Sequence, residues 1–186
     1  MLTMKPRPED WPAHPAALAE GELLKLCDLG RGRSGGPGGQ HRNKVQTLVV
    51  LTHRASGISA QAGERRSAQE NHRVALRRLR LALATHVRAP VPLGECRTPL
   101  WLSRTDKRAG SPGRIACSPA HADYPSMLAE AMDVLDAAGW DLEPASLRLV
   151  VHKTQLVRLI ADHPPAFAEM NRQREARGLR PLKGPR

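Results

Sequence analysis

A run of glycines at residues 35–39, GGPGG, restricts what the chain can form on either side of it. Glycine and proline both disfavour the interior of a helix or a strand, so a regular element that precedes the run must end before it. Glycine also lacks a Cβ atom, which lets the backbone approach a ligand closely. The run leads into QHRNK at residues 40–44, whereas flexible linkers are usually Gly/Ser repeats without such a polar endpoint. We interpret the stretch as a loop that contacts a substrate through its backbone, with an inert basic loop as the alternative.

Short elements surround this loop. Residues 16–29 fit a helical turn that runs into a strand, although periodicity alone does not separate the two. Residues 45–53 are apolar and rich in β-branched side chains, RASG at 54–57 supplies a turn, and residues 58–62 return as a second strand. The pattern predicts a β-hairpin directly after the loop.

Residues 64–88 have the strongest helical pattern in the chain. Ser67 and Glu70 have the spacing of a capping box. Apolar residues recur at helical spacing beside a stripe of arginines, so one helix face can cover a small sheet while the next presents guanidinium groups. The apolar residues are Leu76, Leu79, Leu83 and Val87, and the arginines are Arg66, Arg73, Arg77, Arg80 and Arg88. Few acids accompany these arginines, which favours a nucleic-acid-binding surface over a solvated helix face.

The composition changes after this helix. Residues 90–122 combine proline, glycine and basic residues around Trp101, which predicts an extended linker. The helical pattern that returns predicts three short helices, and the basic residues after Pro165 predict a mobile tail. The predicted segments are a disordered N-terminus at 1–15, a domain with the glycine loop at 16–89, the linker at 90–122, a small helical bundle at 123–164 and a basic tail at 165–186.

Charge is distributed unevenly over the 186 residues. The net charge of +11 makes polyanions the first partners to consider. Residues 31–90 have 12 Lys and Arg against 2 Asp and Glu, a net of +10, whereas residues 123–163 have 3 against 7, a net of −4. The two regions are therefore expected to have different roles.

Three cysteines, Cys27, Cys96 and Cys117, are odd in number and widely spaced, which predicts free thiols in a reducing compartment. A site formed by Cys96, Cys117 and His121 is not favoured, since no Cys-x-x-Cys pair is present, and we predict no metal. No apolar run approaches transmembrane length, and the N-terminus lacks the apolar core of a signal peptide. These features predict a cytoplasmic protein.

The glycine loop and the residues after it resemble a known family. RSGGPGGQHRNK, residues 33–44, resembles the Gly-Gly-Gln loop of the bacterial-type peptide chain release factors. The resemblance continues through a strand that ends in Thr52-His53, a hairpin with Gly57-Ile58 and a helix start at Arg66-Ser67, so that it covers roughly residues 22–88. Full-length members also have a codon-reading domain and a helical domain ahead of this one. Only about twenty residues precede it here, so the chain is similar to the short, codon-independent members that release peptides from stalled ribosomes.

The resemblance implies a fold and an activity. The fold class would be α+β, with a small mixed β-sheet covered by one long helix. The activity would be hydrolysis of the ester that joins a nascent peptide to the P-site tRNA. Gly38 and Gly39 would let the loop enter the peptidyl-transferase centre, and the Gln40 backbone N–H would stabilise the developing oxyanion. The Gln40 side chain would exclude larger nucleophiles. No cofactor is implied, although methylation of the Gln40 amide nitrogen is expected in this family.

The implied partners are the ribosomal RNA of the peptidyl-transferase centre and the P-site peptidyl-tRNA, bound by a monomer that has no membrane contact. The predicted RNA contacts of the first domain are Arg31, Arg33, Ser34, Arg42, Asn43, Lys44, Arg65, Arg66, Arg73, Arg77 and Arg80. Those of the tail are Arg172, Arg174, Arg177, Arg180 and Lys183. For His41 and His53 we expect packing or hydrogen-bonding roles rather than titration.

Residues 139–160 resemble the helix-turn-helix at the end of certain bacterial activators. The matching positions are Gly139, Ala145, Leu149, Val151 and Leu156. His152, Lys153, Gln155 and Arg158 would then face a groove. The negative charge of this region argues against a freestanding DNA reader, and the other interpretation is a bundle that docks on ribosomal protein or stabilises the chain.

Two functions follow from these patterns. The first is codon-independent hydrolysis of peptidyl-tRNA on stalled ribosomes. The alternative is a non-catalytic RNA- or DNA-binding protein that docks through the basic loop and the helix-turn-helix. The intact Gly-Gly-Gln tripeptide at residues 38–40 favours the first function, because a protein that only binds has no need of it.

Overall fold

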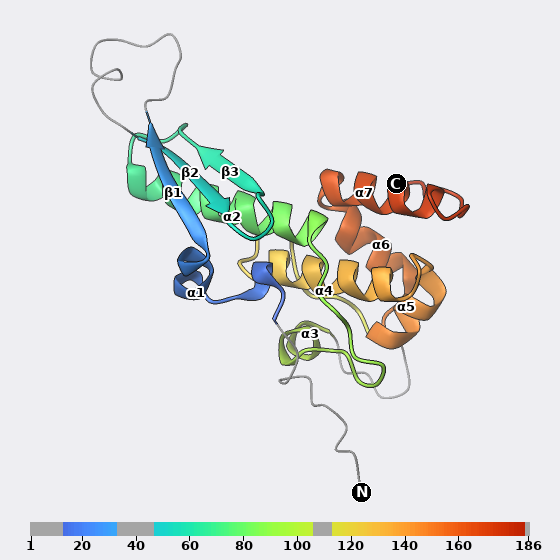
Figure 1. Ribbon diagram of the computed structural model, residues 1–186. Coiled ribbons are helices and arrows are strands. Elements are labelled where there is room, and N and C mark those ends of the chain that lie inside the picture. Colours follow the sequence, from blue (N-terminus) through green and yellow to red (C-terminus); the bar gives the residue numbers. More distant parts are fainter. Residues whose placement is uncertain (1–12, 33–46, 106–112, 185–186) are drawn as a thin grey trace, which may run out of the picture. The chain divides into compact units, whose positions relative to one another are not determined.

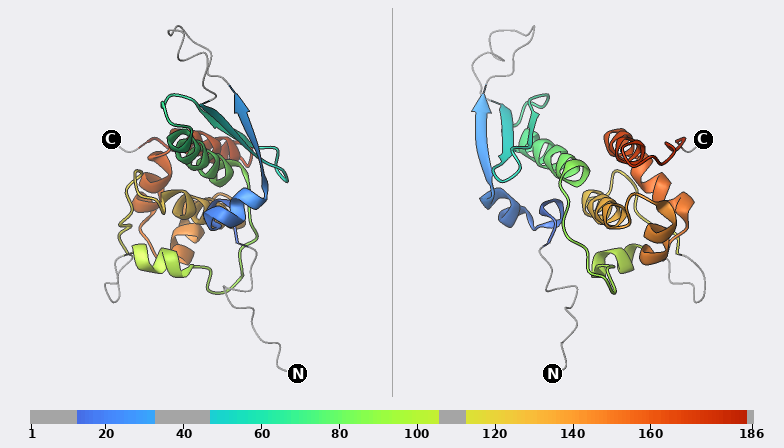
Figure 2. Two further views of the ribbon diagram at one scale, coloured as in Figure 1. Left: turned by 90° about the vertical axis from the view of Figure 1, so that its left-hand side faces the viewer. Right: turned by 45° about the vertical axis from the view of Figure 1, so that its right-hand side comes forward.

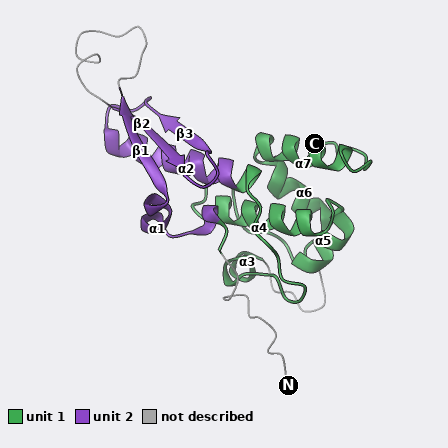
Figure 3. Cartoon of the chain, viewed as in Figure 1, with its two compact units in different colours: residues 1–14, 84–186 green, residues 15–83 purple. Residues whose placement is uncertain are grey.

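The computed structural model describes residues 13–32, 47–105 and 113–184, in two compact units (Figures 1 and 3). Unit 2 comprises residues 15–83, and unit 1 comprises residues 1–14 and 84–186. The boundary falls within the long helix α2, Ala68–His86. The described residues form a mixed α+β structure with one three-stranded sheet and seven α-helices.

Unit 2 contains the sheet, whose strand order is β1-β2-β3. The strands are Cys27–Gly32 (β1), Leu48–His53 (β2) and Ser59–Ala62 (β3). Both strand pairs are antiparallel, so the prediction of a mixed sheet was wrong in this respect. The physical reason is the connectivity, because each strand pairs with its neighbour in sequence and the chain reverses direction between them.

Helix α2 lies across one face of this sheet (Figures 1 and 2), as expected for residues 64–88. Strand β2 alternates half-buried and buried residues, which is the pattern of a strand with one covered face. The buried side chains of unit 2 include Leu23, Val49, Leu51, Ala62, Ala75, Leu76, Leu79 and Leu83. The predicted burial of Leu76, Leu79 and Leu83 is therefore confirmed, while Val87 is half-buried.

Two arginines of unit 2 fasten its elements by donating to backbone carbonyls. Arg54, in the turn after β2, donates to the carbonyl oxygens of Cys27 (2.9 Å) and Lys25, and so ties the turn to helix α1 (Glu20–Lys25) and β1. Arg78 of α2 donates to the carbonyl oxygen of Gln61 (2.7 Å) in β3. These long side chains supply cohesion in a unit whose buried core has no aromatic residue among those described.

Unit 1 is helical. Its helices are Pro99–Arg104 (α3), Tyr124–Ala137 (α4), Leu142–Leu149 (α5), Lys153–Ala161 (α6) and Pro164–Glu175 (α7). Helix α4 contacts α5 and α6, and α6 also contacts α5 and α7 (Figure 1). Ten of the 14 residues of α4 are buried, so this helix is the centre of the unit.

The structure has a helix and a folded segment where the sequence predicted a basic tail. Helix α7 begins at Pro164 because proline is well suited to the first turn of a helix, so the Pro164-Pro165 pair starts this helix as well as ending the preceding one. The side chain of Asn171, within α7, donates to the carbonyl oxygen of Leu182 (3.1 Å) and accepts from the backbone N–H of Leu182 (2.8 Å). This pair of bonds holds the C-terminal residues against the helix.

The segment predicted as a linker also contributes to unit 1. Thr98 caps α3 by accepting from the Trp101 backbone N–H (3.1 Å). Trp101 is fully buried, and its indole N–H donates to the carbonyl oxygen of Leu149 (3.1 Å). The high proline content concealed this helix, because Pro99 occupies its first turn, where the missing N–H costs nothing.

We expect Trp101→Ala to lower the free energy of unfolding of unit 1 by about 3–5 kcal/mol, because it removes a fully buried side chain and leaves a cavity. Urea denaturation followed by circular dichroism measures this change. Leu93→Ala is the matched control, since Leu93 is 103% exposed and its truncation should change stability by less than about 0.5 kcal/mol. Equal effects of the two substitutions would show that the segment behaves as a linker.

A half-buried carboxylate of α4, Glu130, makes the stability of unit 1 depend on pH. Glu130 accepts from the Thr98 backbone N–H (2.9 Å) and hydroxyl (2.6 Å), yet burial raises the pKa of Glu130 to about 7. The pKa in the folded state lies above the unfolded value of about 4.3, so the folded state binds more protons. The resulting stabilisation is complete below about pH 4 and is lost as the pH rises toward 7.

The expected outcome is that Glu130→Gln unfolds with a shallower pH dependence between about pH 4 and 7 than the wild type, because the substituted side chain does not titrate. Urea midpoints across this range measure it. The exposed Glu143 provides the control, and Glu143→Gln should keep the wild-type slope. If Glu130→Gln keeps the wild-type pH dependence of stability, Glu130 is not its source.

Candidate functional site

The register of β1 and β2 fixes where the glycine loop joins the sheet. Gly32, the last residue of β1, pairs with Leu48, the first residue of β2. The chain therefore leaves and re-enters the sheet at neighbouring positions, about 5 Å apart. A Cβ at Gly32 would lie 3.2 Å from Leu48 Cδ2, so glycine permits this close pairing. The predicted catalytic residues lie outside the described residues, as do five of the predicted RNA contacts: Gly38, Gly39, Gln40, Arg33, Ser34, Arg42, Asn43 and Lys44.

The return end of this loop is held by Asn71, which the sequence analysis did not single out. Asn71 lies near the start of α2 and is fully buried. Its amide nitrogen donates to the carbonyl oxygens of Thr47 (2.6 Å) and Arg65 (3.0 Å), and its oxygen accepts from the Arg65 backbone N–H (2.9 Å). The signal that could have found it is its spacing, four residues before the buried Ala75 and eight before Leu79.

Exposed cations surround the end of unit 2 to which the loop is attached. Arg31 immediately precedes Gly32, and the bonds of Asn71 place Arg65 close to Thr47, with Arg66 next to it. Arg31, Arg65, Arg66 and Arg73 are all exposed. Such an arrangement can bind phosphate groups close to the points where the loop joins the sheet.

Two of the predicted RNA contacts in α2 are less accessible. Arg77 is half-buried, and Arg80 donates to the carbonyl oxygens of Ala16 (2.6 Å) and Leu18 (2.7 Å). Burial lowers the pKa of the Arg80 guanidinium, which also indicates a desolvated environment. Its donors therefore hold residues 15–18 against α2.

The arginines predicted for the tail fall into two groups. Arg174 is 8% exposed and donates to the carbonyl oxygens of Trp140 (2.5 Å) and Arg180 (3.1 Å), so its side chain is part of the packing of unit 1. Arg172 is exposed and forms an ion pair with Glu169 (2.6 Å). Arg177, Arg180 and Lys183 are also exposed.

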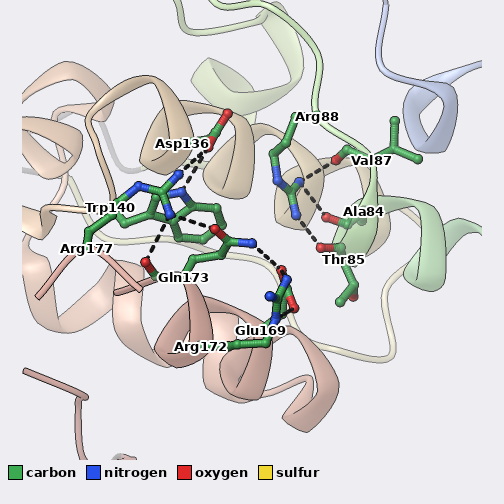
Figure 4. Close-up of polar contacts among 10 residues, drawn as sticks. All are labelled: Ala84, Thr85, Val87, Arg88, Asp136, Trp140, Glu169, Arg172, Gln173 and Arg177. Atoms are coloured by element: carbon green, nitrogen blue, oxygen red, sulfur yellow. Dashed lines mark hydrogen bonds and ion pairs between the residues drawn. The ribbon is translucent and has the colours of Figure 1, made fainter. Parts of the chain in front are cut away.

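Trp140 organises the polar contacts around α7 (Figure 4). The guanidinium carbons of Arg88 and Arg177 lie 5.6 and 5.8 Å from the centroid of the buried indole ring, at distances typical of cation–π contacts. The indole N–H donates to Asp136 (2.9 Å). Arg88 also donates to the carbonyl oxygen of Ala84 (3.0 Å) near the end of α2. Arg88 and Arg177 are therefore fixed by packing as well as by charge.

His53 has the hydrogen-bonding role that we expected. It is 4% exposed, and its Nδ1 lies 2.8 Å from the hydroxyl of Ser56 in the turn between β2 and β3. The Ser56 hydroxyl also accepts from the Ile58 backbone N–H (3.3 Å). The histidine side chain thus stabilises the turn of the hairpin.

Helices α5 and α6 are joined through a three-residue turn, 150–152. Ala145, Leu149, Val151 and Leu156 are all buried, as the helix-turn-helix resemblance requires. Of the four residues expected to face a groove, His152 and Lys153 are exposed, whereas Gln155 and Arg158 line a surface pocket with residues 114–119.

Within the described part of the chain, no group of three His, Cys, Asp or Glu side chains is placed to hold a metal ion. No helix in that part is long and apolar enough to cross a bilayer.

Comparison with known proteins identifies the unit that carries the loop. Residues 27–91 match the RF-1 domain, and the matched range contains Gly38-Gly39-Gln40. This range is similar to the domain that release factors share. No solved structure matches the chain.

Curated proteins similar to part of this chain include a peptide chain release factor homolog of Escherichia coli, which is 54% identical over 43 residues. Peptide chain release factor 1 of Symbiobacterium thermophilum is 43% identical over 54 residues, and peptide chain release factor 2 of Variovorax paradoxus is 46% identical over 54 residues. The matched stretches are 23%, 29% and 29% of this chain and 21%, 15% and 15% of the relatives. The shared part is thus a small fraction of each relative.

Removing the Asn71 amide should destabilise the frame of the loop. We expect Asn71→Ala to lower the free energy of unfolding by about 2–3 kcal/mol, because it leaves backbone groups of Thr47 and Arg65 without a buried partner. Thermal unfolding together with hydrogen exchange of the Arg65 amide measures the effect. Gln69→Ala on the exposed face of α2 is the control and should change stability by less than about 0.5 kcal/mol. Unchanged exchange at Arg65 would contradict this role.

Proposed function

We propose that this protein hydrolyses the ester bond of peptidyl-tRNA on stalled ribosomes without reading a codon. The observation that carries the proposal is the RF-1 domain match over residues 27–91, which encloses Gly38-Gly39-Gln40 between two paired strands. The exposed cations at the loop-bearing end of unit 2 support it, because a ribosomal active site is made of RNA.

In the proposed reaction, water attacks the ester carbonyl carbon of the nascent peptide. Negative charge then develops on the carbonyl oxygen and on the ribose 3′-oxygen that leaves. The Gln40 backbone N–H donates to the developing oxyanion, a contribution that can reach about 3–4 kcal/mol. The proton required by the leaving oxygen is relayed through the tRNA's own hydroxyl group, so the protein needs no histidine or carboxylate base. Gly38 and Gly39 let the loop backbone come close to the ester, and the Gln40 side chain excludes nucleophiles larger than water.

Phosphate contacts hold the loop in place in this proposal. The exposed Arg31, Arg65, Arg66 and Arg73 contribute, together with the predicted contacts in residues 33–44. Arg172, Arg177, Arg180 and Lys183 form a second set of phosphate contacts on unit 1. Arg80 and Arg174 have structural roles first, because their donors are engaged with carbonyl oxygens. The protein would act in the cytoplasm as a monomer that binds the peptidyl-transferase centre and the P-site tRNA.

The same proposal includes codon independence and assigns catalysis and ribosome recognition to different segments. Residues 16–89 would be a catalytic domain of the release-factor type, and the remaining residues would recognise the stalled ribosome. The family match supports a boundary near residue 90, since it covers residues 27–91.

A second candidate function is nucleic-acid binding without hydrolysis, through a helix-turn-helix at α5 and α6. The burial of Ala145, Leu149, Val151 and Leu156 favours it. It is the less favoured candidate, because a protein of this kind leaves the Gly-Gly-Gln loop without a use.

Peptide release from purified ribosomes stalled at the 3′ end of an mRNA without a stop codon tests the main proposal. We expect the wild type to release labelled peptide, and Gly39→Ala to lower the release rate by about 10²–10³-fold, because the added Cβ displaces the neighbouring backbone N–H that binds the oxyanion. Ribosome binding by sedimentation should stay within about twofold. Gly94→Ala is the matched glycine control, since an added Cβ at Gly94 meets nothing within 4 Å.

Ribosomes that present a stop codon or a sense codon complete the experiment. Release that requires the stop codon would overturn codon independence. No release by the wild type, with ribosome binding retained, would overturn the hydrolase and favour the second candidate.

A further inference from the structure

A short segment of unit 1 lies beside α6 and is fixed there by backbone hydrogen bonds. The Gly113 N–H donates to the carbonyl oxygen of Val150 (2.8 Å), and Gly113 forms a parallel bridge with Val151. Ala116 N–H donates to the carbonyl oxygen of Arg104 (2.7 Å) at the end of α3. We call residues 113–119 the strap. Its attachments at two points give it a defined position between the α5–α6 turn and α3.

The strap and α6 enclose a surface pocket of about 350 Å³. This volume is at the lower end of the range for small-ligand sites. The lining residues are Arg114, Ile115, Ala116, Cys117, Ser118 and Pro119 from the strap, and Gln155, Arg158, Leu159 and Asp162 from α6 and the residue after it. The lining contains no aromatic ring on which a base could stack.

The two arginines of the pocket differ from six other cations of unit 1, although Arg180 and Lys183 near the C-terminus are likewise exposed and without a carboxylate partner among the described residues. Arg114 and Arg158 are exposed, and neither forms an ion pair with a carboxylate of the described residues. Six other cations of the unit do have carboxylate partners: Arg88, Arg97, Arg104, Lys153, Arg172 and Arg177. The pocket therefore has two positively charged guanidinium groups that can bind a ligand, and one lining acid, Asp162. Guanidinium groups bind phosphate oxygens through charge-assisted hydrogen bonds.

The strap also decides which nucleic acid the pocket can take. Gln155 and Arg158 are two of the three residues of α6 that a helix-turn-helix would direct into a DNA groove, and here they line one pocket with the strap. A major groove about 12 Å wide admits one helix of about 10–12 Å, and an added strand would exceed this width. A single strand can instead bring one phosphate to the pocket while its bases stay outside.

We propose that this pocket binds a phosphodiester group of single-stranded RNA, without reading its sequence. The choice of RNA among polyanions rests on the proposed function on the ribosome. The binding itself involves only unit 1 and does not depend on the Gly-Gly-Gln loop, so the two proposals can fail separately.

The test uses the full-length protein and a fluorescein-labelled 12-nucleotide oligo(U) RNA, with binding followed by fluorescence anisotropy over a series of salt concentrations. Arg114→Gln combined with Arg158→Gln should weaken binding by at least tenfold and lower the salt slope by about 0.7, the contribution of one phosphate contact on a single strand. The matched control, Arg97→Gln combined with Arg104→Gln, also removes two charges from unit 1, but these already pair with Glu95 and Asp123. Its affinity should change by less than about twofold.

Cys117 supplies a second readout that does not depend on other RNA-binding surfaces. It lines the pocket, whereas Cys27 lies on β1 in unit 2 and Cys96 is 7% exposed. The RNA should slow alkylation of Cys117 by N-ethylmaleimide at least fivefold relative to Cys27, as measured by peptide mass spectrometry. The double variant of the pocket should abolish this protection, and circular dichroism checks that it is folded.

Several outcomes would overturn the proposal. Equal losses in the two double variants would mean that total charge, not the pocket, binds RNA. Stronger protection of Cys117 by an 18-base-pair DNA duplex would indicate a duplex reader, and equal protection by polyglutamate would indicate a site for acidic protein. Protection of Cys117 by RNA in a protein that releases no peptide would uphold the pocket and overturn only the hydrolase.

Discussion

The frame of the glycine loop depends on one buried amide. Asn71 joins the backbone at Thr47, where the loop returns to the sheet, to the backbone at Arg65, just before α2 begins. A fully buried amide is stable only when its donors and acceptor are bonded, so its three bonds also restrict the positions of the groups that supply them. The sheet end, the start of α2 and the neighbouring arginines thus have a fixed geometry that does not rely on a large apolar core.

In both units, polar side chains stabilise the structure by donating hydrogen bonds to the backbone of another segment. Arg54, Arg78 and Arg80 donate to carbonyl oxygens in unit 2, and Trp101 and Arg174 do so in unit 1. The composition explains the recurrence, because only 3% of the residues are aromatic while cations are abundant. Long donors that reach across elements supply specificity where bulky side chains are scarce. A consequence for function is that an arginine in a basic stripe is not automatically available to RNA.

The local elements of unit 2 could be predicted from the sequence because their patterns are local. The apolar, β-branched composition of residues 45–53 and the apolar stripe of Leu76, Leu79 and Leu83 depend only on neighbouring residues. The roles of Asn71 and Arg80 could not be predicted, since their partners lie 24 and 64 residues away. Trp101 was missed for a similar reason, because its partner Leu149 is 48 residues distant and the prolines around it indicated an extended chain. The loop residues of the candidate site were found by resemblance, whereas the pocket beside α6 needed the structure.

The C-terminal residues have a thermodynamic consequence. Asn171 holds Leu182, Arg174 holds Arg180, and Gly178 makes the intervening turn with a φ of +74°. A polyanion that meets Arg177, Arg180 and Lys183 therefore encounters backbone that is already ordered. Its association would take place without the folding transition that accompanies the capture of a disordered basic segment, and calorimetry would record a small change in heat capacity.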